Sequence, residues 1–276
     1  IKNITVSPFD GKVSSLKNSD ILLVSLFWFQ NLLEYCSFLK KYGVDPKKKK
    51  PLIIIGGISA SNTRILNGLF HYAILGDGES VIENVINSIQ NCEEPSGNGI
   101  VKSGDFSDNK FAHSKTIPAF GYVEDRGNNT TRIEIARGCR YKCPFCQLAH
   151  TKPYIEQPLE VVKHLLTGSR SKSVGLFAPD RSGYSDILKL EEICKKMGKH
   201  NTAEDLRLDA VSRMPIVSKL KFGVEGFTEE TRKKFKKVSS NKKLVRGFKH
   251  IFQTLRKPNG KKHTTATMYM IADLPG

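Results

Sequence analysis

Short apolar runs alternate with amphipathic segments along the first third of the chain. The runs have the length and β-branched content of buried strands, and the segments between them repeat apolar residues at helical spacing. The pattern predicts strands at 20–25, 52–57 and 72–75 and helices at 31–41, 59–70 and 80–90. This alternation is typical of a parallel sheet that helices cover on both faces.

The chain then loses its periodicity until about residue 129. This stretch is rich in Gly, Asn, Asp and Ser, which favour turns over regular elements. We interpret residues 93–130 as a linker between a first domain at 1–92 and a second at 131–276.

The second part resumes the alternation of strands and helices, which is typical of consecutive βα units of a barrel. Because it is too short for eight units, we expect a partial barrel whose C-terminal portion lies beyond Gly276. The first residue is Ile1 rather than Met, so we expect a piece of a longer protein. The pattern predicts strands at 132–136, 173–177, 205–208, 220–224 and 265–271 and helices at 159–166, 185–198, 215–218, 229–235 and 242–255.

The composition gives the chain a strong positive charge. The 276 residues include 44 Lys and Arg against 27 Asp and Glu, a formal net charge of +17. Such an excess is compatible with RNA as a partner, although we interpret the basic runs at 47–50 and 232–237 as solvated surfaces. No apolar run approaches the roughly 20 residues of a membrane span.

Three of the six cysteines crowd into eight positions. Cys36, Cys92 and Cys194 are scattered and are expected to be ordinary thiols. A secreted disulfide scaffold would be shorter and richer in cysteine, so we expect a reducing cytoplasm, where a tight cluster indicates metal or redox chemistry.

The clustered cysteines are Cys139, Cys143 and Cys146, spaced Cys-x3-Cys-x2-Cys after a predicted strand and a glycine. Three thiolates on one short loop can face one point in space and bind three irons of a [4Fe–4S] cluster, which leaves the fourth iron without a protein ligand. A structural zinc site would need a fourth ligand, and His150 could supply it.

This segment resembles the signature of the radical S-adenosylmethionine (SAM) superfamily, in which an aromatic residue, here Phe145, precedes the last cysteine. The resemblance implies that the methionine amino and carboxylate groups chelate the open iron. An electron from the cluster then cleaves SAM to a 5′-deoxyadenosyl radical. It also implies an electron donor such as flavodoxin or ferredoxin.

The same resemblance, over residues 131–276, suggests further contacts to SAM. Phe145 would pack on the adenine, Asp180 would meet the methionine amino group, and Glu225 would hold the ribose. The superfamily's Gly-Gly-Glu turn is replaced here by residues 177–180, which lack the glycines. Arg207 and Asp209 match a strand whose polar side chains reach SAM, or form a surface ion pair, and Ile271 matches the segment beside the adenine.

The first domain resembles the cobalamin-binding, Rossmann-like domain that precedes many radical SAM barrels. Glycines at strand ends let a ligand approach the backbone. Ser59 replaces a histidine that relatives often have, and the Asp-x-His-x-x-Gly motif is absent. The alternative is a domain that keeps the fold without the vitamin. The residues that match the cobalamin site are Gly56, Gly57, Ser59, Gly76, Gly78 and Glu79.

Together these features predict an α/β protein with an N-terminal Rossmann-like, cobalamin-binding-like parallel sheet followed by a partial (β/α)6 radical SAM barrel. The implied reaction is cobalamin-dependent methylation of an unactivated carbon. One alternative is methylthiolation or another radical modification of RNA, such as tRNA, without cobalamin. Methylthiotransferases need three further N-terminal cysteines, and this chain has only Cys36 and Cys92 there. A non-catalytic cluster or zinc module is the other alternative.

Overall fold

The computed structural model of the chain forms two compact units, Ile1–Ser114 and Lys115–Gly276. The structure describes residues 16, 19–105, 110–119, 130–201, 206–211, 214, 219–237, 240–255 and 265–272. The short helix predicted at 215–218 lies outside these residues.

The first unit is built on a four-stranded sheet in the order β1 (Ile21–Ser25), β2 (Leu52–Gly56), β3 (Tyr72–Ile74) and β4 (Ile100–Lys102). The first three strands are parallel, and β4 is antiparallel to β3. Leu23 is opposite Ile54 in the β1–β2 register. The three predicted strands of this unit are therefore confirmed.

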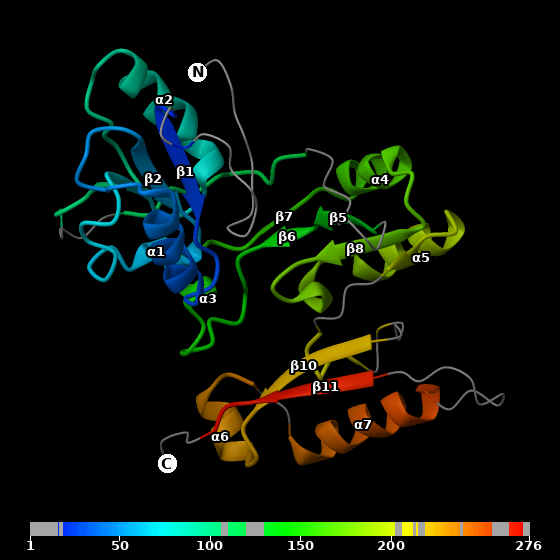
Figure 1. The fold of residues 1–276 in the computed structure, drawn as a ribbon. Helices are drawn as coiled ribbons and strands as arrows, with labels where there is room; N and C mark the ends of the chain where they lie inside the picture. Colours follow the sequence, from blue (N-terminus) through cyan, green and yellow to red (C-terminus); the bar gives the residue numbers. More distant parts are fainter. Residues whose placement is uncertain are drawn as a thin grey trace. The chain divides into compact units, whose positions relative to one another are not determined.

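Helices α1 (Asn31–Tyr42) and α2 (Ile82–Gln90) cover opposite faces of this sheet (Figure 1). The side chains of strand β2 explain why both faces are covered. Ile53 and Ile55 point into the core under α1, whereas Ile54 points into the core under α2. A strand that is buried on both faces has a continuous apolar run instead of an alternating one. The helices predicted at 31–41 and 80–90 are confirmed.

Two expectations for this unit are wrong. Residues 59–70 form no α-helix: a 3-10 turn, η2 (Ile58–Ser61), is followed by turns, and Gly68 has a φ of 78°. Serine, asparagine and glycine in this segment favour turns over helix. The predicted linker contains β4, a three-residue strand within a segment rich in turn-forming residues, and a bridge joins Gly76 to Ala112.

The second unit contains three small sheets. The first sheet has three parallel strands in the order β5 (Thr130–Glu134), β8 (Ser173–Phe177) and β9 (His200–Asn201). In the second sheet, β6 (Ala136–Arg137) is antiparallel to β7 (Ile155–Glu156). In the third, β10 (Lys219–Glu225) is parallel to β11 (Thr265–Met270). The helices are α3 (Gln147–Thr151), α4 (Leu159–Gly168), α5 (Ile187–Lys196), α6 (Glu229–Lys234) and α7 (Asn241–Leu255), with a 3-10 turn, η4, at Arg181–Gly183.

One hydrophobic core joins these elements. It includes Leu176 of β8, Leu190 of α5, Phe222 of β10 and Ile251 of α7. In Figure 1, α7 lies along β10 and β11, and the rings of Phe222 and Phe248 are 5.9 Å apart. None of the helices in the described ranges is long and apolar enough to cross a bilayer.

Most predicted elements of this unit are confirmed, but the strand at 205–208 is not. Residues 206–208 form no strand, although the Leu206 N–H donates a hydrogen bond of 3.1 Å to the Lys221 carbonyl of β10. Asp205 lies outside the described residues. The two-residue strands β6, β7 and β9 and the five-residue helix α3 lack the length for a recognisable period.

Gly76 provides a test of the first unit. Its φ is 99°, and a methyl group added there would overlap the Ala112 backbone, whereas at Gly68, also with positive φ, a methyl group would meet nothing within 4 Å. We expect Gly68→Ala to lower the free energy of unfolding by about 1 kcal/mol through backbone strain alone. Gly76→Ala should cost about 2 kcal/mol more because it also disrupts packing. Urea denaturation of both variants measures the difference, and equal losses would contradict the clash.

Candidate functional site

The three clustered cysteines lie on one loop between β6 and α3. Cys143 is buried, Cys139 and Cys146 are half-buried, and all three are free thiols. Gly138 opens the loop with a φ of 70°, and any side chain there would collide with the Pro153 backbone. A glycine is therefore required where the chain turns from β6 into the cysteine loop.

Side chains between the cysteines anchor this loop. The Arg140 guanidinium donates to Glu156 Oε1 at 2.6 Å. Glu156 Oε1 also accepts from the backbone and the hydroxyl of Ser185, at 3.0 and 3.1 Å. Lys142, whose φ is 48°, donates to the Ala149 carbonyl in α3 at 2.5 Å. Contacts of this kind hold the thiols in place before any ligand binds.

The donor set fits an iron–sulfur cluster better than zinc. His150 Nε2 lies 3.0 Å from the Cys143 carbonyl oxygen, so the ring braces the loop backbone. Within the described part of the chain, no three His, Cys, Asp or Glu side chains converge around one metal ion. A structural zinc site would need a fourth ligand beside the three thiolates, whereas three thiolates suffice to bind three irons of a [4Fe–4S] cluster.

Arg207 and Asp209 lie against the cysteine loop. Their side chains form a two-pronged ion pair, with Arg207 Nε 3.1 Å from Asp209 Oδ1 and Nη2 3.2 Å from Oδ2. The guanidinium carbon lies 3.8 Å from the centre of the Tyr141 ring. The ion pair considered as an alternative therefore forms, with Arg207 buried and Asp209 half-buried. Tyr141, between the first two cysteines, is a contact that the sequence did not single out.

Asp180 follows β8 and is also buried. Its Oδ1 accepts a hydrogen bond of 2.6 Å from the Ser182 hydroxyl, and its Oδ2 has no hydrogen-bond partner among the described residues. Burial raises the pKa of this carboxyl group, against the lowering effect of the Ser182 hydrogen bond. Burial also raises the pKa of Cys139, and the negative charge of Asp180 adds to that increase. A buried carboxylate oxygen near the cysteine loop is suited to a cationic ligand.

Glu225 ends β10 in a strained conformation, with a φ of 66° where the register of β10 against β11 shifts. Its carbonyl accepts a 3.3 Å hydrogen bond from the Ile271 N–H, so two predicted SAM contacts are neighbours. Its Oε1 is 3.2 Å from Lys237 Nζ. Left-handed backbone at a residue other than glycine is costly and is frequently found at functional sites.

Phe145 connects the cysteine loop to the end of α6. Its ring is 44% exposed, 5.8 Å from the Phe235 ring and 5.9 Å from Lys237 Nζ. The interpretation of 232–237 as a solvated face is wrong for two of its members, because Arg232 is buried and Lys237 is half-buried. Helical charge spacing alone did not distinguish these two from their exposed neighbours.

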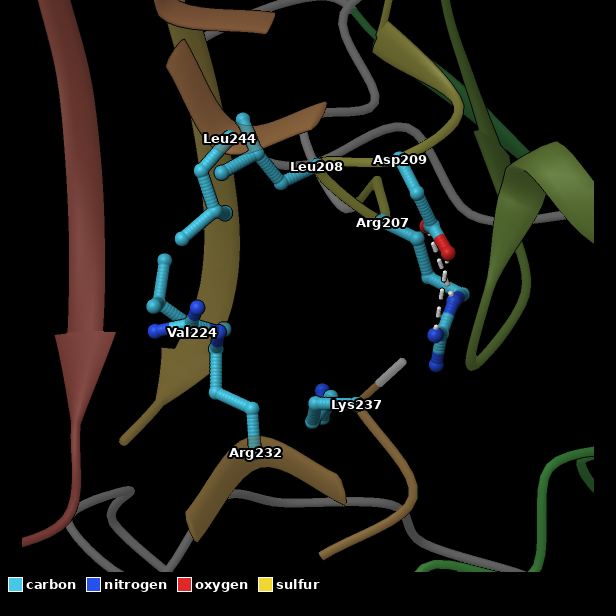
Figure 2. A pocket seen from close by; sticks show the side chains of 8 residues that line it. Arg207, Leu208, Asp209, Val224, Arg232, Lys237 and Leu244 are labelled. Atoms are coloured by element: carbon cyan, nitrogen blue, oxygen red, sulfur yellow. Dashed lines mark hydrogen bonds and ion pairs between the residues drawn. The ribbon is translucent and has the colours of Figure 1, made fainter. Parts of the chain in front are cut away.

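A small pocket, open to solvent, lies between Arg207 and Asp209, the end of β10, and Arg232 and Lys237. Figure 2 shows Arg207 and Asp209 on one side of it, Val224 and Leu244 on the other, and Arg232 and Lys237 at its lower end. The pocket is therefore lined by both charged and apolar side chains.

Contacts within the chain itself account for two of the glycines at which cobalamin was predicted to approach the backbone. A methyl group at Gly57 would lie 2.5 Å from the Leu26 carbonyl oxygen, and one at Gly76 would overlap Ala112. Gly56 and Gly78 would meet only ordinary contacts. These close backbone approaches are internal, so they do not indicate a ligand.

The other residues of that prediction lie at the carboxyl edge of the sheet. The Ser59 hydroxyl donates to the Phe27 carbonyl at 3.0 Å, and Glu79 is exposed. The adjoining segment after β1 exposes three aromatic rings in a row: Phe27, Trp28 and Phe29 are 52%, 65% and 59% exposed. The sequence pattern alone did not single out this aromatic segment.

The radical SAM superfamily model matches residues 133–272, about half of the chain, which therefore belongs to the radical SAM superfamily. Membership implies a [4Fe–4S] cluster and SAM as cofactors. No curated protein matches the sequence.

Two solved enzymes have a similar fold. One is the radical SAM methyltransferase TsrM from Kitasatospora setae, solved with tryptophan substrate and a SAM analogue, with a TM-score of 0.60, 11% identity and 94% of this chain covered. The other is the cobalamin-dependent radical SAM enzyme OxsB, solved with aqua-cobalamin and SAM, with a TM-score of 0.58, 13% identity and 91% covered. This chain spans 57% of the length of the first and 40% of the second.

Asp180 gives a pH-dependent prediction for the ligand-free protein. Because its pKa is raised above the ordinary value of 3.8, its ionised form destabilises the fold at neutral pH. We expect Asp180→Asn to raise the free energy of unfolding at pH 7, and the gain to shrink as the pH falls through the raised pKa. Urea denaturation across this pH range measures the effect.

The surface variant Asp186→Asn is the control, since it removes the ion pair with Lys189 and should be neutral or slightly destabilising. A loss of stability in Asp180→Asn at pH 7 would contradict the view of Asp180 as an uncompensated buried charge.

Proposed function

We propose that this protein cleaves SAM reductively at a [4Fe–4S] cluster and uses the resulting radical for cobalamin-dependent methylation of an unactivated carbon. The observation that carries the proposal is the anchored loop of three free thiols within the region that matches the superfamily. We further propose that the protein acts in the cytoplasm and receives electrons from a flavodoxin or ferredoxin.

The cysteine loop is proposed to hold the cluster through Cys139, Cys143 and Cys146. When bound, the cluster supplies the electron that cleaves SAM and an open iron for its methionine end. The protein holds the thiols apart on a fixed loop and limits the access of water to the buried Cys143. The hydrogen bonds of Arg140 to Glu156 and of Lys142 to Ala149 fix the loop.

The residues around the loop are proposed to bind SAM. Asp180 offers a buried carboxylate oxygen to the methionine ammonium, and Arg207 with Asp209 lines the adjoining pocket. Glu225 accepts hydrogen bonds from the ribose hydroxyls, with Phe145 and Ile271 beside the adenine. Arg207 contacts the cysteine loop, Asp209 pairs with Arg207, and Ile271 bonds to Glu225, while the charge of Asp180 acts on Cys139, which supports a common site.

We propose a partial (β/α)6 barrel for the second unit. The parallel pairs β5–β8–β9 and β10–β11 share one core, and the Leu206–Lys221 hydrogen bond connects the segment after β9 to β10, as adjacent barrel strands would be connected. Both features support the arrangement.

For the first unit we propose cobalamin binding at the carboxyl edge of its sheet. The fold similarity to OxsB, which was solved with aqua-cobalamin, supports this assignment. The exposed aromatic segment Phe27–Phe29 lies at that edge and would cover the apolar periphery of a corrin ring. The glycine turns add no support, for the reason given above.

The cluster assignment is tested by anaerobic reconstitution with iron and sulfide. We expect about four irons per chain and a broad visible absorption, since three thiolates hold one [4Fe–4S] cluster. Substitution of Cys139, Cys143 or Cys146 by Ala should abolish both signals, whereas Cys36→Ala should change neither. One tightly bound zinc and a colourless protein would overturn the assignment.

The cobalamin assignment is tested by equilibrium binding of hydroxocobalamin to the holoprotein. We expect Trp28→Ala to weaken binding about 10-fold, because it removes a large apolar contact. The control Leu188→Ala removes an apolar side chain that is also exposed, at 56%, on the second unit, and should leave binding unchanged. A wild-type protein that binds no cobalamin would contradict the assignment.

A further inference from the structure

Lys237 contacts two residues of the proposed SAM site at once. Its Nζ lies 3.2 Å from Glu225 Oε1 and 5.9 Å from the centre of the Phe145 ring. Figure 2 shows it at the lower end of the pocket, across from Arg207 and Asp209. Neither the superfamily signature nor the charge pattern of 232–237 had assigned it a role.

The ion pair is shielded from water. The side chains of Lys237 and Glu225 are only 18% and 11% exposed, unlike the surface pair Lys234–Glu230, at 53% and 80%. Attraction between charges is stronger where water is excluded, and a buried carboxylate that loses its cation is strongly unfavourable. This pair therefore constrains Glu225 in a way that the surface pairs of α6 cannot constrain their partners.

The backbone around Glu225 is shaped for this contact. Glu225 has left-handed φ, and the neighbouring Gly223 has no side chain, which leaves space that the Glu225 carboxylate and the Lys237 ammonium share. A Cβ at Gly223 would overlap Glu225 Oε1 and lie 3.0 Å from Lys237 Nζ. The strained residue and the missing side chain together direct the carboxylate toward Lys237.

The segment that carries Lys237 is tied to the turn after Glu225. The buried Arg232 guanidinium donates to the carbonyls of Gly226 and Phe227, at 3.1 and 2.7 Å. The Lys237 N–H in turn donates to the Arg232 carbonyl at 2.7 Å. Lys237 is therefore held in place relative to the end of β10.

We propose that Lys237 is a positioning residue for the adenosine half of SAM, an inference that rests on the proposed function. Its ammonium binds one carboxylate oxygen of Glu225, neutralises the buried charge and orients the group to accept hydrogen bonds from the ribose hydroxyls. Its position near Phe145 links this carboxylate to the aromatic residue proposed to pack on the adenine. The methionine half of SAM, at Asp180 and the cluster, is independent of Lys237.

Equilibrium binding to the reconstituted holoprotein tests this role with two ligands, SAM and L-methionine, which lacks the adenosine. We expect Lys237→Met to weaken SAM binding about 10-fold or more, as the loss of a charge-assisted contact does, and to leave methionine binding unchanged. Lys237→Arg, which keeps the cation, should restore most of the SAM affinity. Lys233→Met, which removes an exposed charge from the preceding helix α6, should bind both ligands like the wild type.

Two outcomes would overturn the inference alone. Equal SAM affinity in Lys237→Met and wild type would show that Glu225 needs no partner. Equal losses for SAM and methionine would show a general structural role. A wild-type holoprotein that binds no SAM would overturn the proposed function itself and the inference with it.

Discussion

The site depends on one constraint: three thiols must be held apart on an eight-residue loop before a cluster exists to organise them. A loop this short cannot form a core of its own, so its order comes from contacts with neighbouring elements. The residues between the first two cysteines provide those contacts, with Arg140 reaching Glu156, Tyr141 packing under Arg207, and Lys142 reaching Ala149. The three residues between the first two cysteines thus attach the loop to its surroundings, beside the proposed ligands.

The sequence predicted most of the helices and strands that are long enough to show a period. It missed β4, β6, β7 and β9, which have two or three residues and form only where a neighbouring strand supplies hydrogen bonds. The equally short β3 was predicted because its apolar run continues to Leu75. The failed helix at 59–70 shows the converse, since Leu66 and Phe70 have helical spacing and are buried, yet they pack from a series of turns. Their burial in the tertiary structure accounts for the apolar spacing, although the backbone between them is not helical.

Within the site, residues could be predicted one at a time but their connections could not. Arg207 and Asp209 are two positions apart in the sequence, so their pairing was foreseeable, whereas the stacking of Arg207 on Tyr141 joins segments more than sixty residues apart. The glycines at the strand ends of the first unit illustrate a related point. At Gly57 and Gly76 φ is positive and another backbone segment comes close, and the approaching groups are Leu26 and Ala112 of the same unit.

The two aromatic residues of the cysteine loop show how the parts of the site are coupled. Tyr141 packs against a cation paired with Asp209, and Phe145 lies near a cation paired with Glu225. At each of these two rings the nearby carboxylate is paired with a cation, which offsets its negative charge beside the three thiols, whereas the charge of Asp180 raises the pKa of Cys139. Because like charges placed directly against thiolates oppose their ionisation, the two cations allow Asp209 and Glu225 to lie near the loop at a lower electrostatic cost. Part of the chain's large positive charge thus serves the site rather than the surface.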